Sequence, residues 1–208
     1  MNLQLVYKII AKIYDLLDVV YFSDYNRSPR KVVYEAVKEK DKVLDICTGT
    51  AENAIHIAKN KPNTKVAGID ISKDMLKIAK NKVKRKGIAN IKIGYMDAVK
   101  LQFRNETFDK VMISLVLHEV EESMAKQMIL EAKRVLKKDG RIIITEWEPA
   151  KSGWRKIVFL PVHLLEPKTY REFIKKDMKK YFSEFGLNIV KTIHCDYSKV
   201  MIVERSNF

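Results

Sequence analysis

Residues 43–51 read Val-Leu-Asp-Ile-Cys-Thr-Gly-Thr-Ala, a short apolar run that passes into a loop of small residues. The run predicts a buried strand over residues 42–46, and the residues after the loop predict a helix over 51–59. A second apolar run, residues 65–70, ends in an acid as well, Asp70. Strand, small-residue loop, helix and acid-terminated strand together indicate an α/β protein with a nucleoside cofactor site.

The loop itself disfavours two common nucleotide sites. Gly49 is the single glycine of the loop. Cys47 and Ala51 stand at positions where a dinucleotide-binding loop requires glycine. No Gly-Lys-Ser or Gly-Lys-Thr follows, as a nucleoside triphosphate loop would require. We therefore expect a nucleoside cofactor without a pyrophosphate, with a nicotinamide oxidoreductase as the weaker alternative.

The composition indicates one soluble globular domain. The chain has 208 residues, of which 47% are hydrophobic and 32% charged. No apolar run approaches the roughly 20 residues that span a bilayer, and charges interrupt residues 1–20, unlike a secretory signal peptide. The two cysteines, Cys47 and Cys195, lie far apart without a Cys-x-x-Cys motif, so we expect no disulfide framework, no metal site and a cytoplasmic location.

The formal net charge of +14 is the unusual feature of the composition. Residues 73–86 are its densest part, with seven basic side chains and the single acid Asp74. This stretch is a solvated helix face, a nucleic-acid contact, or a surface for anionic membranes or acidic substrates. The absence of interleaved aromatic residues favours the solvated face.

Strands and helices alternate along the chain. The predicted strands cover residues 42–46, 66–70, 91–95, 108–115 and 141–146, followed by an antiparallel pair over 187–193 and 199–204. The predicted helices cover residues 3–20, 30–38, 51–59, 72–86, 122–136 and 169–185. Short loops between alternating elements require right-handed parallel crossovers. We predict an α/β fold with a doubly wound, mostly parallel seven-stranded sheet, helices on both faces and an antiparallel C-terminal strand pair.

In such a sheet the ligand lies outside the carboxyl ends of the strands. There Asp70 can accept hydrogen bonds from ribose hydroxyls, and Asp97 can accept one from an adenine amino group while the Ala98 amide donates to the ring. Asp45 and the Gly49 backbone can meet an amino-acid moiety. Each acid alone could be an ordinary turn residue, but their occurrence at successive strand ends favours a binding site.

The predicted cofactor set joins these residues to the loop and to an apolar pair that can enclose the adenine ring. Its members are Asp45, Cys47, Thr48, Gly49, Thr50, Asp70, Ile71, Met75, Asp97, Ala98 and Ser114.

These motifs resemble those of class I S-adenosylmethionine-dependent methyltransferases. The matching segments are residues 43–46 with Gly49-Thr50, residues 68–72, residues 108–118 and residues 136–141. The resemblance covers about residues 30–205 and implies a Rossmann-like fold with S-adenosylmethionine as cofactor. Residues 7–17 also resemble the ubiquinone/menaquinone C-methyltransferase-like branch. Cys47 and Ala51 depart from the glycines usual in the family, so a cofactor-binding member without transfer activity stays open.

The resemblance implies direct in-line displacement at the cofactor's methyl group. The protein then has to align the acceptor and exclude water, and it needs a base only where the acceptor loses a proton. His118, just after the fourth strand, is the candidate catalytic residue, with an orienting or structural histidine as the alternative. No metal is expected, since the residues after His118 lack the second histidine of a zinc helix.

We expect the acceptor pocket between the N-terminal helix and residues 147–170. Its predicted residues are Tyr14, Tyr25, His118, Trp147, Trp154 and His163. The aromatic content indicates an apolar or ring-bearing acceptor, and ordinary packing of a long loop is the alternative. The predicted organisation is a single domain over residues 1–208, with residues 1–40 as a helical cap and 147–170 as a substrate lid.

The functional hypothesis is a methyltransferase for a small-molecule or lipid-precursor acceptor, with peripheral membrane contact open. The net charge motivates an RNA methyltransferase as the alternative. A base-holding motif such as Asn-Pro-Pro-Tyr would favour RNA, but the residues after the fourth strand read Ser114-Leu115-Val116-Leu117.

Overall fold

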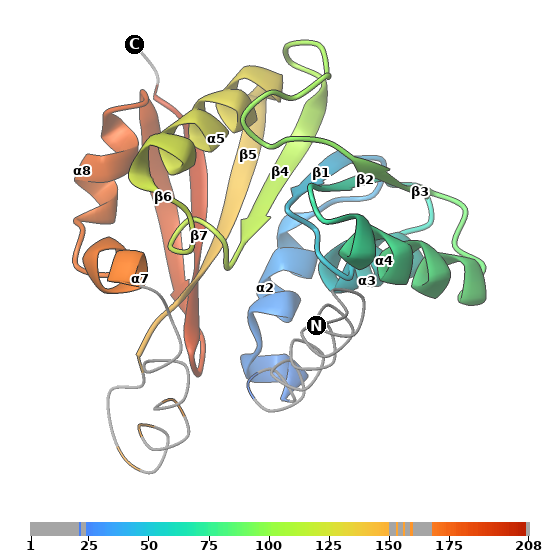
Figure 1. The fold of residues 1–208 in the computed structure, drawn as a ribbon, viewed down its shortest axis with the longest axis horizontal. Coiled ribbons are helices and arrows are strands. Elements are labelled where there is room, and N and C mark those ends of the chain that lie inside the picture. Colours follow the sequence, from blue (N-terminus) through green and yellow to red (C-terminus); the bar gives the residue numbers. More distant parts are fainter. Residues whose placement is uncertain are drawn as a thin grey trace, which may run out of the picture.

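The computed structural model describes residues 24–149 and 168–206, together with Tyr21, Gly153, Lys156 and Phe159. Within these parts, a seven-stranded sheet carries helices on both faces (Figure 1). The predicted helix over residues 3–20 lies outside the described residues. No helix of the described parts is long and apolar enough to cross a membrane.

The strands confirm the predicted doubly wound sheet. They are β1 (Lys42–Ile46), β2 (Lys65–Asp70), β3 (Ile91–Tyr95), β4 (Phe108–Ser114), β5 (Leu136–Trp147), β6 (Leu187–His194) and β7 (Ser198–Arg205). Their order in the sheet is β3-β2-β1-β4-β5-β7-β6. Strands β1 to β5 are parallel to one another, and β7 runs antiparallel between β5 and β6. The order reverses between β1 and β4, where such sheets open a crevice for ligands.

Local capping signals explain where the helices begin. The helices are η1 (Tyr25–Arg27), α2 (Pro29–Ala36), α3 (Glu52–Asn60), α4 (Lys73–Arg85), α5 (Glu122–Val135), α7 (Lys168–Phe173) and α8 (Met178–Ser183). Ser28 caps α2, with Pro29 at its first position. Ser72 caps α4 by accepting a hydrogen bond from the Met75 amide. Beyond the end of α4, Gly87 has a φ of +63°.

The prediction of a single helix over residues 169–185 is wrong. The structure has two short helices, α7 and α8, because Asp177 interrupts the run with an extended backbone (φ −69°, ψ 101°). The Asp177 side chain accepts hydrogen bonds from the amides of Lys179 and Lys180, and therefore caps α8. An aspartate that satisfies backbone donors in this way favours a helix start over a helix interior.

The sheet separates two apolar layers, as alternating side chains of a buried strand require. On one face, Leu44 and Val111 pack with α5 and α8. On the other face, Val43 and Met112 pack with α2, α3 and α4. The two layers position the carboxyl ends of the strands, where the predicted site residues lie.

Strand β5 approaches β4 closely at Gly140, where there is no room for a side chain. A methyl group at this position would lie 2.7 Å from Leu136 Cδ1 and 2.9 Å from the carbonyl oxygen of Asp109. The carbonyl belongs to the sheet and cannot move away, so Gly140→Ala should lower the free energy of unfolding by about 1–3 kcal/mol. Urea unfolding of the purified variant measures this change.

Gly94→Ala is the matched control, because none of the described residues places a heavy atom within 4 Å of a methyl group there. It should leave stability unchanged or raise it by about 0.5 kcal/mol. Equal urea midpoints for the two variants would contradict the close packing of Gly140.

Candidate functional site

A cavity of about 470 Å³ opens at the carboxyl ends of the parallel strands. Its volume lies within the range of about 300–1,000 Å³ typical of small-molecule sites. Every residue of the predicted cofactor set lines it: Asp45, Cys47, Thr48, Gly49, Thr50, Asp70, Ile71, Met75, Asp97, Ala98 and Ser114. The structure thus brings these residues together, and their contacts to a cofactor stay a prediction.

The loop after β1 obtains its shape with a single glycine. Cys47, Gly49 and Ala51 have φ values of 55°, 54° and 65°, in the left-handed region that favours glycine. The amide of Thr48 donates to the carbonyl of Ile69, and the amide of Ala51 donates to that of Thr48, each at 2.8 Å. The loop therefore keeps a glycine-like path at Cys47 and Ala51, where the sequence departs from the family pattern.

Asp70 connects the loops that follow β1 and β2. Its carboxylate accepts hydrogen bonds from the amides of Gly49 and Ser72, both at 2.8 Å. An ionised carboxylate has about four acceptor positions, so capacity remains for a ligand's hydroxyl groups. The sequence indicates the ligand-facing role of Asp70 but not this bridge, since the bridge spans residues 21 positions apart.

Asp45 is a buried carboxyl group at the floor of the cavity. It is 3% exposed and accepts a hydrogen bond from the Thr48 hydroxyl at 2.5 Å. Burial raises the pKa of Asp45 to about 7, the Thr48 bond opposes this rise, and the nearby charge of Asp70 adds to it. Asp45 therefore changes charge near neutral pH, and a bound cation would favour its ionised form.

The thiol of Cys47 is not a nucleophile at neutral pH. Burial raises its pKa to about 12, and the carboxylates of Asp70 and Asp45 add to this rise. Since the thiolate is the reactive form of cysteine, Cys47 remains a neutral wall of the cavity.

The apolar side of the cavity contains residues that sequence reasoning missed. They are Met96, Val99, Leu115, Val116, Val120, Met124 and Met128. Met124 and Met128 lie four residues apart on α5, and this helical spacing was the available signal. Asn53 on α3 and Thr145 on β5 also line the cavity without having been predicted.

The cavity is acidic although the chain is strongly basic. Arg30 is the one basic residue among the described residues that line it, whereas the acids are Asp45, Glu52, Asp70, Asp97 and Glu119. Glu52 is paired with Lys82 at 2.6 Å. The remaining excess of carboxyl groups suits a positively charged ligand. Within the described residues, no group of three His, Cys, Asp or Glu side chains is arranged to hold a metal ion.

His118 is not among the described residues that line the cavity. Its side chain is buried, and Nδ1 pairs with the buried carboxylate of Glu146. Glu146 also accepts a hydrogen bond from the amide of Leu117, and the Tyr170 ring packs edge-on against the imidazole. The structure therefore places the side chain of His118 in the core, paired with Glu146, rather than at the cavity.

Of the predicted acceptor residues that the structure describes, Tyr25, His118 and Trp147, none lines this cavity. Tyr25 is 40% exposed, and its hydroxyl pairs with Nε2 of His56 at 3.3 Å on the surface of α3. Trp147 instead packs with Tyr21 and Phe159, at centroid distances of 5.6 and 5.9 Å. These rings pack against one another, and neither Tyr25 nor Trp147 is among the described residues that line this cavity, so their place in an acceptor pocket stays a prediction.

Three other predicted acceptor residues, Tyr14, Trp154 and His163, lie outside the described residues. The proposed lid over residues 147–170 also falls mostly outside them.

Known proteins share both the sequence pattern and the fold. The profile of the ubiE/COQ5 methyltransferase family matches residues 1–182. A demethylmenaquinone methyltransferase of Bacillus cytotoxicus is 30% identical, with 89% of this chain aligned to 87% of that protein. The enzyme of the same name from Bacillus subtilis is also 30% identical, over 89% of this chain and 88% of its own length.

The fold is similar to that of a SAM dependent methyltransferase from Aquifex aeolicus. The two structures superpose with a TM-score of 0.73 and 22% identity, over 95% of this chain and 97% of that one. The family match extends over most of the chain, and residues from three of the four motif segments, among them Asp45, Asp70 and Ser114, line one cavity at the strand ends. The chain therefore belongs to the ubiE/COQ5 methyltransferase family and is an S-adenosylmethionine-dependent methyltransferase.

Proposed function

We propose that the acceptor is a quinone-type small molecule, a reduced naphthoquinone of the demethylmenaquinone type. The observation that carries this proposal is the near full-length similarity to relatives named demethylmenaquinone methyltransferase. A cavity that joins a polar loop to a wall of apolar side chains, among them Leu115 and Val116, supports a ring-bearing acceptor beside the cofactor.

The residues of the cavity fit S-adenosylmethionine. Carboxylates at Asp70 and Asp97 suit ribose hydroxyls and an amino group, and Asp45 suits an ammonium group. Ile71 and Met75 can hold the adenine ring between them. When bound, the cofactor supplies a methyl group on a positively charged sulfur. This sulfur is a good leaving group without further activation. The excess of acids favours this cation over its neutral product.

What the chain itself contributes is alignment and exclusion of water. The left-handed loop after β1 and the Asp70 bridge hold the cofactor-facing groups in place. The burial of His118 against Glu146 supports an orienting role for this histidine rather than proton abstraction from the acceptor.

The distribution of charge supports a small acceptor over RNA. On α4 the side chains of Lys77, Lys80 and Lys84 are exposed, but none of them lines the cavity. An RNA methyltransferase would be expected to gather its cations at the mouth of its site.

The acceptor assay tests the proposal directly. Purified protein with methyl-labelled S-adenosylmethionine should transfer label to reduced demethylmenaquinone and to the shorter analogue 1,4-naphthoquinol, both detected by chromatography. Total RNA and a phospholipid extract serve as parallel acceptors. Label in RNA, or label in none of the acceptors, would refute a quinone-type substrate.

Asp70→Ala should weaken binding of S-adenosylmethionine by about 10–100-fold in calorimetry, because hydrogen bonds to a charged group are lost. Asp177→Ala is the matched control, since Asp177 also accepts two backbone amides but caps α8 outside the cavity. Equal affinity in wild type and Asp70→Ala would remove Asp70 from the cofactor site.

The raised pKa of Asp45 predicts a pH dependence of cofactor binding. Below pH 7 its carboxyl group is mostly protonated, and above pH 7 it is ionised and attracts the cofactor's positive charge. Affinity should rise about tenfold from pH 6 to pH 8. Binding near pH 6.5 should therefore release a proton, which calorimetry in buffers of different ionisation enthalpy measures. A proton release that persists unchanged in Asp45→Asn would contradict this assignment.

A further inference from the structure

We propose that the hydroxyl groups of Thr145 and Ser114 form a subsite for one oxygen atom of the acceptor. This inference rests on the proposed function and adds the position at which the quinol ring is held. Neither residue was assigned to the acceptor on sequence grounds, since Ser114 was predicted for the cofactor and Thr145 for no role.

The first observation is the state of Thr145. Its side chain is 3% exposed and lines the large cavity, yet Oγ1 has no hydrogen-bond partner among the residues that the structure describes. Native proteins satisfy nearly all buried polar atoms. Because the cavity that Thr145 faces is large enough to hold a ring-sized ligand, its buried hydroxyl without a partner indicates that a ligand atom completes its hydrogen bonding.

Ser114 supplies a second hydroxyl beside the first. It pairs with Thr145 in the register of β4 and β5, and neighbouring strands are about 4.8 Å apart. Both side chains line the same cavity. The Ser114 Oγ atom accepts a hydrogen bond from the side-chain Nδ2 of Asn53 at 3.3 Å, so the hydroxyl proton of Ser114 remains available. Two hydroxyl protons can thus reach a single ligand oxygen.

The strand order separates this pair from the cofactor residues. Asp97, Asp70 and Gly49 follow β3, β2 and β1, which lie on one side of the point where the strand order reverses. Thr145 lies on β5, on the other side of that point and two strands away from β1. A cofactor that extends from Asp97 to Gly49 ends near β1, so a group over β5 belongs to the acceptor.

The chemistry of the pair fits a quinol oxygen. Two neutral donors suit a ring oxygen that carries negative charge, and they fix the orientation of the ring. An anionic group such as phosphate would call for cations, and Arg30 is the one basic residue among the described residues that line this cavity. A ring hydroxyl or carbonyl is thus the better match.

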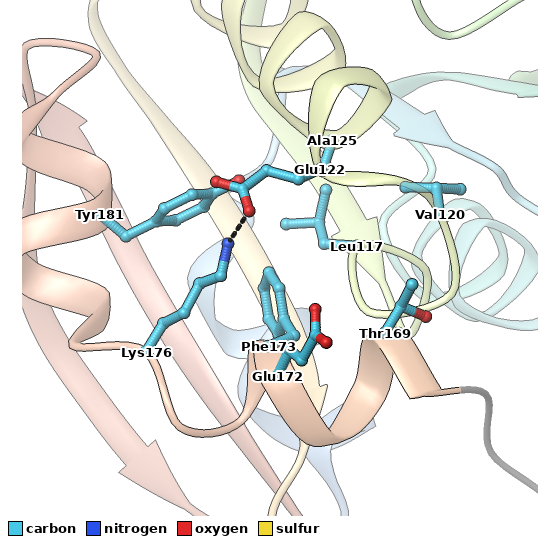
Figure 2. Close-up of a pocket in the computed structure, with 9 residues that line it drawn as sticks. All are labelled: Leu117, Val120, Glu122, Ala125, Thr169, Glu172, Phe173, Lys176 and Tyr181. Atoms are coloured by element: carbon cyan, nitrogen blue, oxygen red, sulfur yellow. Dashed lines mark ion pairs between the residues drawn. The ribbon is translucent and has the colours of Figure 1, made fainter.

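A second cavity offers a matched control. It has a volume of about 30 Å³ and lies between α5, α7 and α8, with the hydroxyl of Thr169 at its edge and the Glu122–Lys176 ion pair opposite (Figure 2). In the described residues Thr169 Oγ1 is also buried without a hydrogen-bond partner. This space holds one or two water molecules but not an aromatic ring. Thr169→Val therefore removes the same group from a place where no acceptor fits.

The test measures acceptor binding apart from turnover. Protein saturated with S-adenosylhomocysteine is titrated with 1,4-naphthoquinone, followed by the quenching of tryptophan fluorescence. Thr145→Val should raise the dissociation constant about five- to tenfold, the loss of one ligand hydrogen bond. Thr145→Ser retains the hydroxyl and should recover most of the affinity, and Thr169→Val should bind like the wild type.

Steady-state rates with 1,4-naphthoquinol then distinguish a role of Thr145 in positioning the acceptor from a role in packing the protein core. Thr145→Val should raise KM for the quinol while leaving the calorimetric affinity for S-adenosylmethionine within twofold. Ser114→Ala provides a second variant should Thr145→Val fail to fold, and it too should weaken naphthoquinone binding.

Two results would overturn the inference while the proposed function stands: wild-type naphthoquinone affinity in both variants, or weakened cofactor binding in place of weakened acceptor binding. A wild-type protein that binds no naphthoquinone would overturn both proposals. Naphthoquinone binding that depends on Thr145, but without methyl transfer to any quinol, would overturn the proposed function and support the subsite.

Discussion

Strands β1 and β4 lie side by side in the sheet, but the helices that follow them cover opposite faces. Helix α3 packs on the face of Val43, and α5 packs on the face of Leu44. The loops that leave the two strands must therefore diverge, and the space between them is the beginning of the cavity. The other features of the site lie around this space. They are the acids after β2 and β3 and the hydroxyl groups at the ends of β4 and β5.

The loop after β1 shows how a backbone path can be kept when the residues that favour it are replaced. Cys47 and Ala51 adopt left-handed conformations that cost each of them on the order of 1–3 kcal/mol. The bridge from Asp70 to the Gly49 amide and the bond from Thr48 to Ile69 hold the loop in that path. Surrounding hydrogen bonds thus hold Cys47 and Ala51 in a backbone path that glycine would adopt more easily.

The charge of the protein is divided between its surface and its cavity. The chain carries a formal net charge of +14, but carboxyl groups predominate among the described residues that line the cavity. Burial of Asp45 limits the cost of this arrangement, because its raised pKa of about 7 leaves the carboxyl group partly protonated at neutral pH when no cation is near. The exposed lysines of α4 are therefore separate from the acids that line the cavity.

The sequence by itself determined the strands, their alternation with helices and the residues at the strand ends. These follow from local rules: apolar period, capping residues such as Ser72, and the placement of ligands at the ends of parallel strands. The whole predicted cofactor set meets at one cavity for this reason. The predicted helix over residues 169–185 is interrupted at Asp177, whose side chain caps α8. The spacing of apolar residues continues across Asp177, so it did not indicate this break.

Only the tertiary structure decided which side chains face the cavity. His118 and Glu146 are 28 positions apart, and their pairing in the core depends on how β5 packs beside the loop after β4. Trp147 joins an aromatic cluster for the same reason, since rings from distant segments fill one another's space. That the Thr145 hydroxyl has no hydrogen-bond partner among the described residues is likewise a result of packing between segments distant in the sequence. Burial and partnership are properties of the packed molecule, and no spacing along the chain encodes them.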